Sequence, residues 1–454
     1  MPGTGGNAFC RMDEGMRIHV SSLGCKLNQN EMDTLADRLA RAGHQIVATA
    51  EEADLCVFNT CAVTHIAARK SRQALRRLHR ENPSARLVVT GCYAELAADD
   101  LRTLPGVEQV VGNRGKESLA AQIGPAAPPT RPVPHSPPRH RTRALVKIQD
   151  GCDNACTYCI IHVARGPQRS RPAAQILAEI RERLAAGHQE IVLTGVHIGG
   201  YGHDRDGETG MNLWQLVARI LAETDVPRLR LSSIEPWDLP PEALALWQDP
   251  RLCPHLHLPL QSGCDATLRR MNRHYTTSRF ADLVAAARAA IPDLAVTTDL
   301  IVGFPGETEA EFAASLAFVR EMGFARVHVF PYSQRAGTPA AEMPDQVAPP
   351  VKAERARAMR EAAAAAARSF RRRFVGRTVD VLWESSRPGE KGLLWSGLTA
   401  NYLRVQAVSA ADLHNRLLPT RLTGITAGGL RGKVMEKSPP SAADRVRSGG
   451  PAGG

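Results

Sequence analysis

Short apolar runs alternate with helical patterns in the first part of the chain. Three strand patterns, RIHVSSLGC, ADLCVFNTC and ARLVVTGC, each end on a cysteine. Apolar residues at helical spacing follow each of them. Strands that alternate with helices predict a parallel sheet with helices on its faces. We therefore expect an N-terminal α/β domain.

Strand and helix patterns alternate again after a proline-rich stretch. Helical patterns separate most of six strand patterns, which predicts an open (β/α)6 barrel rather than the complete eight-unit barrel. The strand patterns are ALVKIQ, EIVLTGVHIG, RLRLSSI, HLHLPLQ, AVTTDLIVGF and ARVHVFPYS.

A long helical segment, VKAERARAMREAAAAAARSFRRRF, then leads into three β-type stretches, RTVDVLW, YLRVQAV and NRLLPTRLTGIT, which are separated by turns. We expect a small β-barrel there. The predicted domains are a flexible leader (1–15), the N-terminal α/β domain (16–124), a Pro-rich linker (125–143), the barrel with its connecting helix (144–375), the small β-barrel (376–436) and a disordered tail (437–454).

Composition narrows the class of protein. Ten cysteines in 454 residues are too sparse for a disulfide scaffold, so metal ligation in a reducing compartment is favoured. There is no basic segment followed by an apolar one at the N-terminus, and no apolar run approaches the roughly 20 residues of a membrane span. A soluble, cytoplasmic protein is expected. The formal charge of +11 favours a polyanionic partner.

The motif GCDNACTYC places Cys152, Cys156 and Cys159 in a loop after the first barrel strand. Three thiolates at such short gaps can hold three irons of a 4Fe–4S cluster and leave the fourth iron open. The alternative is a zinc site with His162 as a fourth ligand, although structural zinc prefers paired ligand spacing.

Cys25, Cys61 and Cys92 form a second group, because each closes a strand pattern. The carboxyl ends of parallel strands share one edge of a sheet, so the three thiols should lie together. A single free cysteine is usually only a small buried hydrophobe. That reading suits Cys56, Cys253 and Cys264.

With these motifs, the chain resembles the radical S-adenosylmethionine methylthiotransferases from Arg17 to Met435. It is most similar to the branch that acts on N6-threonylcarbamoyladenosine in tRNA. The motifs that carry the resemblance are SLGCKLNQNEMD, NTCAVTHIAARKSRQ, GCYAE, KIQDGC, TGVHIG, SSIEPWD, LHLPLQSGCDATLRRMNR and DLIVGFPGET. One departure is His162, where relatives often have proline.

The resemblance implies two 4Fe–4S clusters, each with one open iron. The cluster on Cys152, Cys156 and Cys159 would reduce S-adenosylmethionine to methionine and a 5′-deoxyadenosyl radical. The cluster on the N-terminal triad would supply sulfur, and a second S-adenosylmethionine the methyl group. The expected product is 2-methylthio-N6-threonylcarbamoyladenosine, formed at C-2 of the base at tRNA position 37. The implied partners are the anticodon stem-loop and an electron donor of the flavodoxin or ferredoxin type.

Residues at the ends of barrel strands are candidates for binding S-adenosylmethionine, although each could instead be a turn or cap residue. Arg165, behind the cluster loop, could meet a carboxylate or phosphate, or lie solvated at the surface. The strand-end candidates are Thr194, Gly195, Ser232, Ser233, Glu235, Gln261, Asp299 and Gly303.

The C-terminal β-barrel resembles the RNA-gripping TRAM domain of these enzymes. Basic residues at its entrance are candidate phosphate contacts, with a solvated helix end as the alternative. They are Arg371, Arg372, Arg373 and Arg377, with Arg368 beside them.

Two other functions stay open at this point. A sister methylthiotransferase would modify isopentenyladenosine in tRNA or an aspartate of a ribosomal protein. An iron–sulfur protein that only carries electrons or binds RNA would not cleave S-adenosylmethionine.

Overall fold

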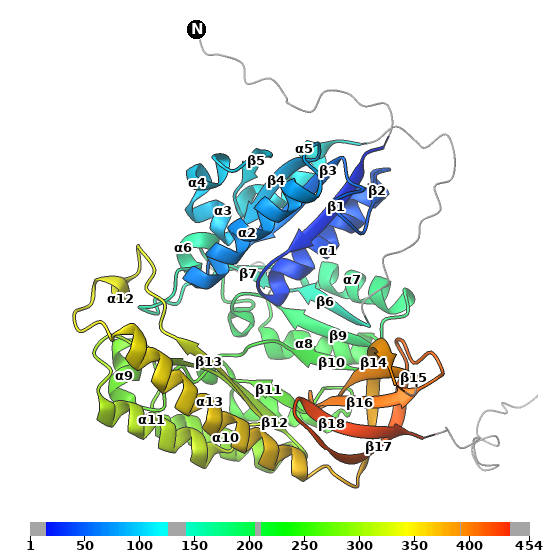
Figure 1. Cartoon of the computed structure of the whole chain (residues 1–454). Coiled ribbons are helices and arrows are strands. Elements are labelled where there is room, and N and C mark those ends of the chain that lie inside the picture. The colour runs from blue at the N-terminus through cyan, green and yellow to red at the C-terminus, as the bar shows by residue number, and fades with distance from the viewer. Residues whose placement is uncertain (1–14, 126–141, 205–209, 391, 436–454) are drawn as a thin grey trace, which may run out of the picture.

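The protein folds into an α/β sheet domain, an open β/α barrel and a small closed β-barrel (Figure 1). This computed structural model describes residues 15–125, 142–204, 210–390 and 392–435. Almost all of the expected leader and linker, and the expected tail, lie outside the described residues. In the described part of the chain, no helix is long and apolar enough to span a membrane.

The N-terminal domain is the parallel sheet that the strand patterns predict, in the order β2-β1-β3-β4-β5. Every residue of β3 is buried, because helices cover both faces of the sheet. Two short strands, β2 and β5, were not predicted. The elements are β1 (Arg17–Ser22), α1 (Lys26–Arg41), β2 (Gln45–Ile46), β3 (Leu55–Thr60), α2 (His65–Glu81), β4 (Arg86–Gly91), α3 (Cys92–Leu96), α4 (Ala98–Arg102), β5 (Val107–Val111) and α5 (Leu119–Ile123).

The central domain is an open barrel of six parallel strands, as expected. Strands β10-β9-β6 and β11-β12-β13 form two sheets, which are joined where the Ile234 amide donates to the His257 carbonyl at 3.0 Å. The strands are β6 (Arg143–Lys147), β9 (Glu190–Thr194), β10 (Leu229–Leu231), β11 (His255–His257), β12 (Ala295–Val302) and β13 (Arg326–Pro331), and the short β7 (Gln149–Asp150) and β8 (Arg169–Ser170) pair separately. The helices are α6 (Ile161–Arg165), α7 (Ala173–Ala185), α8 (Leu213–Glu223), α9 (Asp265–Arg270), α10 (Thr277–Ala290), α11 (Glu309–Met322), α12 (Pro339–Glu342) and α13 (Pro349–Arg372).

The C-terminal domain is a closed barrel in the order β14-β15-β16-β18-β17. The three predicted stretches form β14, β16 and β17, and two further strands complete the barrel. Its core includes Trp383, Val405 and Leu422. The strands are β14 (Thr378–Gly389), β15 (Gly392–Thr399), β16 (Arg404–Ser409), β17 (Leu417–Thr426) and β18 (Gly429–Val434).

The three domains pack on one another. The short helix α6, which leaves the GCDNACTYC loop, lies against α3 of the N-terminal domain (Figure 1). Arg228, just before β10, donates to the Leu398 carbonyl in the small barrel at 3.0 Å. Arg230, within β10, donates to the Ala400 carbonyl there at 2.8 Å. These contacts fix the edges of the sheets relative to one another.

Candidate active site between two cysteine triads

The N-terminal triad gathers at the carboxyl edge of its sheet. Cys25 caps α1, Cys61 follows β3, and Cys92 begins α3. Burial, with contributions from the neighbouring Cys25 and Cys92 thiols, raises the pKa of Cys61 to about 11. A Cβ on Gly24 would lie only 3.1 Å from the Cys61 sulfur, so glycine lets the Cys25 turn pass close to Cys61.

The second triad lies in one loop, which its own backbone organises. The Cys159 amide donates to the Cys156 carbonyl at 3.1 Å. The amides of Asn154 and Ile161 point at the sulfur atoms of Cys152 and Cys159, each at 3.4 Å. Amides that face sulfur stabilise thiolate, the form that binds iron.

Neither triad forms a compact site for a single ion. Among the described residues, no three His, Cys, Asp or Glu side chains converge closely enough to hold one metal ion. The structure does not bring His162, on α6, together with the thiols in such a site. Three thiols without a fourth protein ligand suit a larger group that keeps one coordination position open.

Arg165, the last residue of α6, joins the two triads. Its guanidinium donates to Glu31 and Asn28 on α1, both at 2.8 Å, and to Asp150 on β7 at 2.9 Å. The side chain is only 2% exposed. Of the two alternatives for Arg165, contact with a carboxylate is confirmed and the solvated surface arginine is wrong, because α6 packs into the domain interface.

The polar network around Arg165 reaches the loops that carry Cys25 and Cys61. The Asn28 amide donates to the carbonyls of Leu23 and Thr60, which precede Cys25 and Cys61 by two residues and one. Glu31 also accepts a 2.6 Å bond from Lys116. Although burial opposes ionisation of Glu31, the charges of Arg165 and Lys116 lower its pKa to about 2. The network thus stays charged at neutral pH.

A second network flanks the GCDNACTYC loop. Arg273 lies 3.5 Å from the Cys156 sulfur and forms a buried ion pair with Glu235. His197 bonds Asp238 at 2.6 Å. Burial opposes protonation of His197, but Asp238 and Cys152 raise its pKa to about 10. Arg273 and His197 were not singled out from the sequence, because neither is close to the cysteines in the chain, although the motifs LHLPLQSGCDATLRRMNR and TGVHIG contain them.

Several of the strand-end candidates already have structural roles. Glu235 is paired with Arg273, and the Gly303 amide donates to Glu307 at 2.9 Å. A Cβ on Gly195 would lie 2.9 Å from the Gln149 carbonyl, so the chain itself requires this glycine. Thr194 is buried, whereas Ser232 is half-buried and Ser233 exposed. A cofactor role for each of these stays a prediction.

Gln261 and Asp299 line a cavity of about 190 Å³ between the triads. Cys159 contributes to its wall, as do Val63 and Thr64, which lie just beyond Cys61 in the chain. The cavity therefore lies between the barrel strands and the N-terminal domain, where a small molecule would meet both loops.

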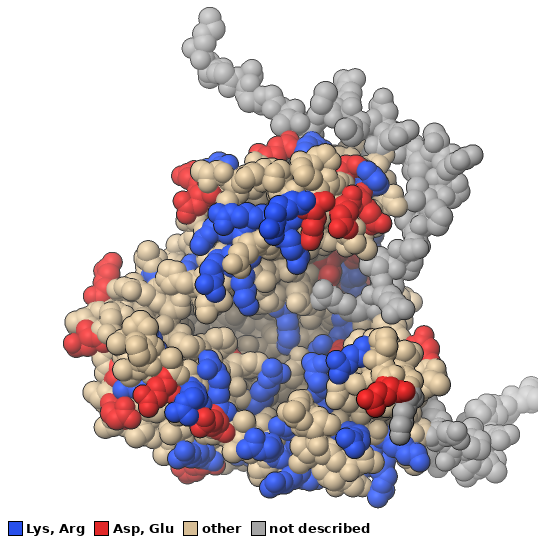
Figure 2. Space-filling view, in the orientation of Figure 1, with Lys and Arg blue, Asp and Glu red and all other residues tan. Residues whose placement is uncertain are grey.

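Basic side chains gather on one face of the protein. Figure 2 shows Lys and Arg residues over α2, on the rim of a central hollow. Exposed members on this helix are Arg69, Lys70, Arg76, Arg77 and Arg80. This set was not singled out from the sequence, although THIAARKSRQALRRLHR displays it.

The predicted RNA contacts at the entrance of the small barrel differ in availability. Arg372 and Arg373 are exposed. Arg371 is partly buried, and its Nε donates to the Ala367 carbonyl at 3.0 Å. Arg377 is held by Asp293 at 2.8 and 2.5 Å, so it braces the barrel against the loop before β12.

Known proteins share this architecture. The uncharacterized protein family UPF0004 matches residues 17–112, and the radical SAM superfamily matches residues 146–319. The solved structure of TsrM from Kitasatospora setae, a radical S-adenosylmethionine methyltransferase, superposes with a TM-score of 0.53 at 15% identity, over 72% of this chain and 77% of that one. This likeness shows the fold.

Relatives with closer sequences cover nearly the whole chain. The threonylcarbamoyladenosine tRNA methylthiotransferase MtaB of Bacillus subtilis is 36% identical over 89% of this chain and 93% of its own. MtaB of Thermotoga maritima is 38% identical, over 81% and 86%. A tRNA-2-methylthio-N(6)-dimethylallyladenosine synthase of Sorangium cellulosum is 34% identical, over 95% and 96%. The chain therefore belongs to the radical S-adenosylmethionine tRNA methylthiotransferase family and is an enzyme of that class.

Proposed function

We propose that the protein converts N6-threonylcarbamoyladenosine at position 37 of tRNA to its 2-methylthio derivative, with two 4Fe–4S clusters. The observation that carries this proposal is the pair of cysteine triads that face one interface and share Arg165. The names of the Bacillus and Thermotoga relatives favour threonylcarbamoyladenosine as the substrate.

Cys152, Cys156 and Cys159 would hold one cluster, and Cys25, Cys61 and Cys92 the other. When bound, these groups supply reductive cleavage of S-adenosylmethionine and a source of sulfur, chemistry that no side chain provides. Two S-adenosylmethionine molecules would be consumed per turnover, and a flavodoxin or ferredoxin would supply electrons.

The chain's own residues would position the reactants. Gln261 and Asp299 line the cavity beside Cys159, where S-adenosylmethionine would bind. Asp299 lies 3.3 Å from His257, which fixes its carboxylate at the cavity wall. Loop bases of tRNA are already unpaired and can enter such a pocket at low cost.

RNA would lie across the face that carries α2 and the central hollow (Figure 2). The cations of α2 and the exposed Arg372 and Arg373 would contact phosphates on either side. Partly buried Arg371 and ion-paired Arg377 would contribute less.

Nucleoside analysis of tRNA from a deletion strain tests the proposal. We expect the methylthio mark to vanish from threonylcarbamoyladenosine and to return with the wild-type gene. Loss of the mark from isopentenyladenosine instead would assign the sister activity, which the Sorangium relative's name describes. If reduced, reconstituted protein forms no deoxyadenosine, the enzyme reaction proposed here is wrong.

A further inference from the structure

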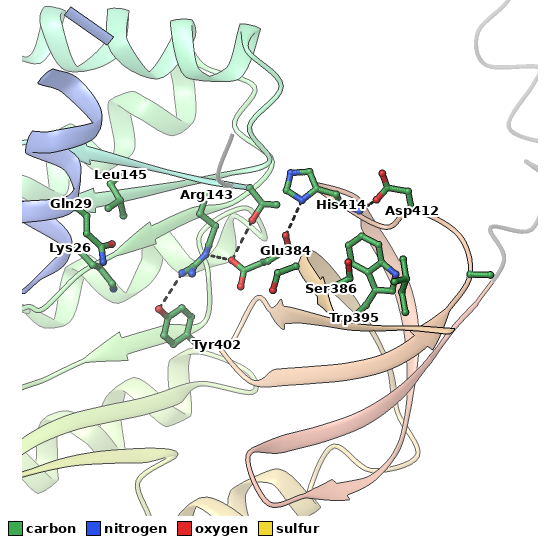
Figure 3. Close-up of a pocket in the computed structure, with 14 residues that line it drawn as sticks. Lys26, Gln29, Arg143, Leu145, Glu384, Ser386, Trp395, Tyr402, Asp412 and His414 are labelled. Carbon is green, nitrogen blue, oxygen red and sulfur yellow. Dashed lines mark hydrogen bonds and ion pairs between the residues drawn. The ribbon is translucent and has the colours of Figure 1, made fainter. Parts of the chain in front are cut away.

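A cavity of about 840 Å³ lies where the three domains meet. Its walls come from the start of α1, from β6 and from the small barrel, and Lys26 reaches into it from α1 (Figure 3). Lys26 directly follows Cys25 in the chain. The cavity therefore begins one residue from the triad that we propose as the sulfur site.

Tyr402 forms the centre of a cationic cluster at this junction. Its ring lies 4.6 Å from the guanidinium of Arg230, 5.6 Å from that of Arg143 and 5.5 Å from the Lys26 ammonium. The tyrosine backbone has φ 67, a left-handed conformation that is uncommon for a residue with a side chain. Strained backbone of this kind concentrates at binding sites.

Two of the three cations are already neutralised. Arg230 donates to the buried carboxylate of Glu190 at 2.7 and 3.0 Å. Arg143 donates to Glu384 at 2.5 Å (Figure 3). Lys26 forms no ion pair with any residue that the structure describes. Lys26 is thus a cation of this cluster without a carboxylate partner among the described residues, and it lines the cavity.

We infer that Lys26 binds the carboxylate of the threonylcarbamoyl group and so selects this substrate over adenosines with an uncharged N6 substituent. The inference rests on the proposed function. C-2 and C-6 of adenine both flank N1, so a base whose C-2 approaches the Cys25 site has its N6 substituent close to that site, and Lys26 is the next residue along the chain. Gln29, one turn along α1, lines the same cavity and can contact the polar parts of that group.

A backbone phosphate is the other anion that Lys26 could bind. The position of Lys26 favours the carboxylate, because the ammonium lies over the Tyr402 ring between domains rather than on the basic face around α2. The two sources differ in one respect that can be measured: only the carboxylate disappears when the threonyl group is converted to a neutral amide.

Binding of anticodon stem-loops to the reconstituted enzyme, without S-adenosylmethionine, tests the inference. Three stem-loops are compared: one with threonylcarbamoyladenosine, one with its threonyl amide and one with unmodified adenosine. We expect wild-type protein to bind the carboxylate form about 10- to 100-fold more tightly than the amide, the range of a charge-assisted hydrogen bond. Lys26→Gln should bind both equally, and Lys26→Arg should keep the preference.

Lys70→Gln, on the exposed face of α2, is the matched control and should leave the ratio of the two affinities unchanged. Iron content confirms that each variant keeps its clusters. The inference is overturned, while the proposed function stands, if Lys26→Gln retains the preference for the carboxylate or lowers the affinity for both stem-loops by the same factor. If wild-type protein does not distinguish threonylcarbamoyladenosine from adenosine, the proposed substrate itself fails.

Discussion

The two cysteine triads are built in opposite ways. Cys152, Cys156 and Cys159 lie within one loop whose own amides organise it. Cys25, Cys61 and Cys92 come from three separate crossovers of a parallel sheet. A local loop can hold its ligands with few tertiary contacts, whereas the N-terminal triad exists only when the sheet has formed.

Because the two triads are built separately, a contact between them is needed to set their relative position, and Arg165 provides it. The guanidinium ties α1, which carries the Cys25 loop, to Asp150 at the entry of the other loop. A buried charge network of this kind fixes geometry more than it adds stability. We therefore expect changes in one triad to leave the other intact, and changes in Arg165 to affect both.

The largest effects come from removing each triad. Replacing Cys152, Cys156 and Cys159 by alanine should abolish deoxyadenosine formation, because we propose that this triad holds the cluster that cleaves S-adenosylmethionine. Replacing Cys25, Cys61 and Cys92 should abolish methylthiolation but leave deoxyadenosine formation. Both products are measured by chromatography with mass detection. Cys264→Ala, at a cysteine outside both triads, should keep both; loss of deoxyadenosine in the N-terminal variant would contradict the division of roles.

Arg165→Met should cost about 1.5 to 3 kcal/mol of unfolding free energy, because Glu31 and Asp150 lose buried charge-assisted hydrogen bonds and keep only Lys116 and Lys147 as ion-pair partners. The variant should also uncouple the cleavage of S-adenosylmethionine from methylthiolation, so that more deoxyadenosine forms per methylthio product. Urea unfolding and the ratio of the two products measure these effects. A variant with an unchanged ratio would reduce Arg165 to a purely structural contact.

Glu31→Gln probes the same network through pH. The pKa of Glu31 is lowered from 4.5 to about 2, so the carboxylate stabilises the fold above pH 4.5 and loses this effect as pH falls toward 2. The variant should be about 3 kcal/mol less stable than wild type at pH 7. This gap in unfolding free energy should narrow as the pH falls. Urea unfolding of cluster-free protein at several pH values measures the gap.

The exposed pair of Arg17 and Asp54 provides the control for this experiment. Asp54→Asn should cost less than about 1 kcal/mol, because solvent screens an exposed ion pair. A gap between wild type and Glu31→Gln that does not change with pH would contradict the assignment.

Two glycines allow each triad to be perturbed without touching a cysteine. Gly24→Ala would place a Cβ 3.0 Å from that of Cys61, and Gly151→Ala would place one 1.9 Å from the Pro167 carbonyl, both at positive φ. Each should cost about 1 to 3 kcal/mol and lower the iron bound at its own triad only. Gly428→Ala, with open space around it, is the control; equal loss from both triads would contradict their independence.

The smallest effect concerns RNA. Arg372→Gln should weaken tRNA binding about 2- to 5-fold and reduce the salt slope by about 1, because one phosphate contact is lost. Arg377→Gln should change the slope less, since that side chain is held by Asp293. Fluorescence titration at several salt concentrations measures both. A larger slope change for Arg377 would reverse this ranking.

Periodicity predicted most of the fold, because the barrel strands and the cysteine-ending strands are short apolar or alternating runs that helical patterns separate. The strands β15 and β18 were missed, since GLLWSGLT and GLRGKV are interrupted by glycine and polar residues. Their pairing is decided by closure of the barrel rather than by local pattern.

The cysteine triads could be proposed from the sequence because their spacing and strand-end positions are local signals. The surroundings could not be found in this way. Arg165 meets Glu31 134 residues away, and Lys26 meets Tyr402 only after three domains have packed. The available signal was weak: Asn28 and Glu31 are polar residues at positions of α1 that face its buried side.

The central claim is that two triads hold two clusters, each with one open iron. Iron and sulfide quantitation with Mössbauer spectroscopy, on anaerobically reconstituted protein, tests it most directly. The account predicts about eight irons and eight sulfides per chain, falling to about four of each when either triad is replaced by alanine. About four irons in the wild-type protein, or a cluster with four protein ligands, would contradict it.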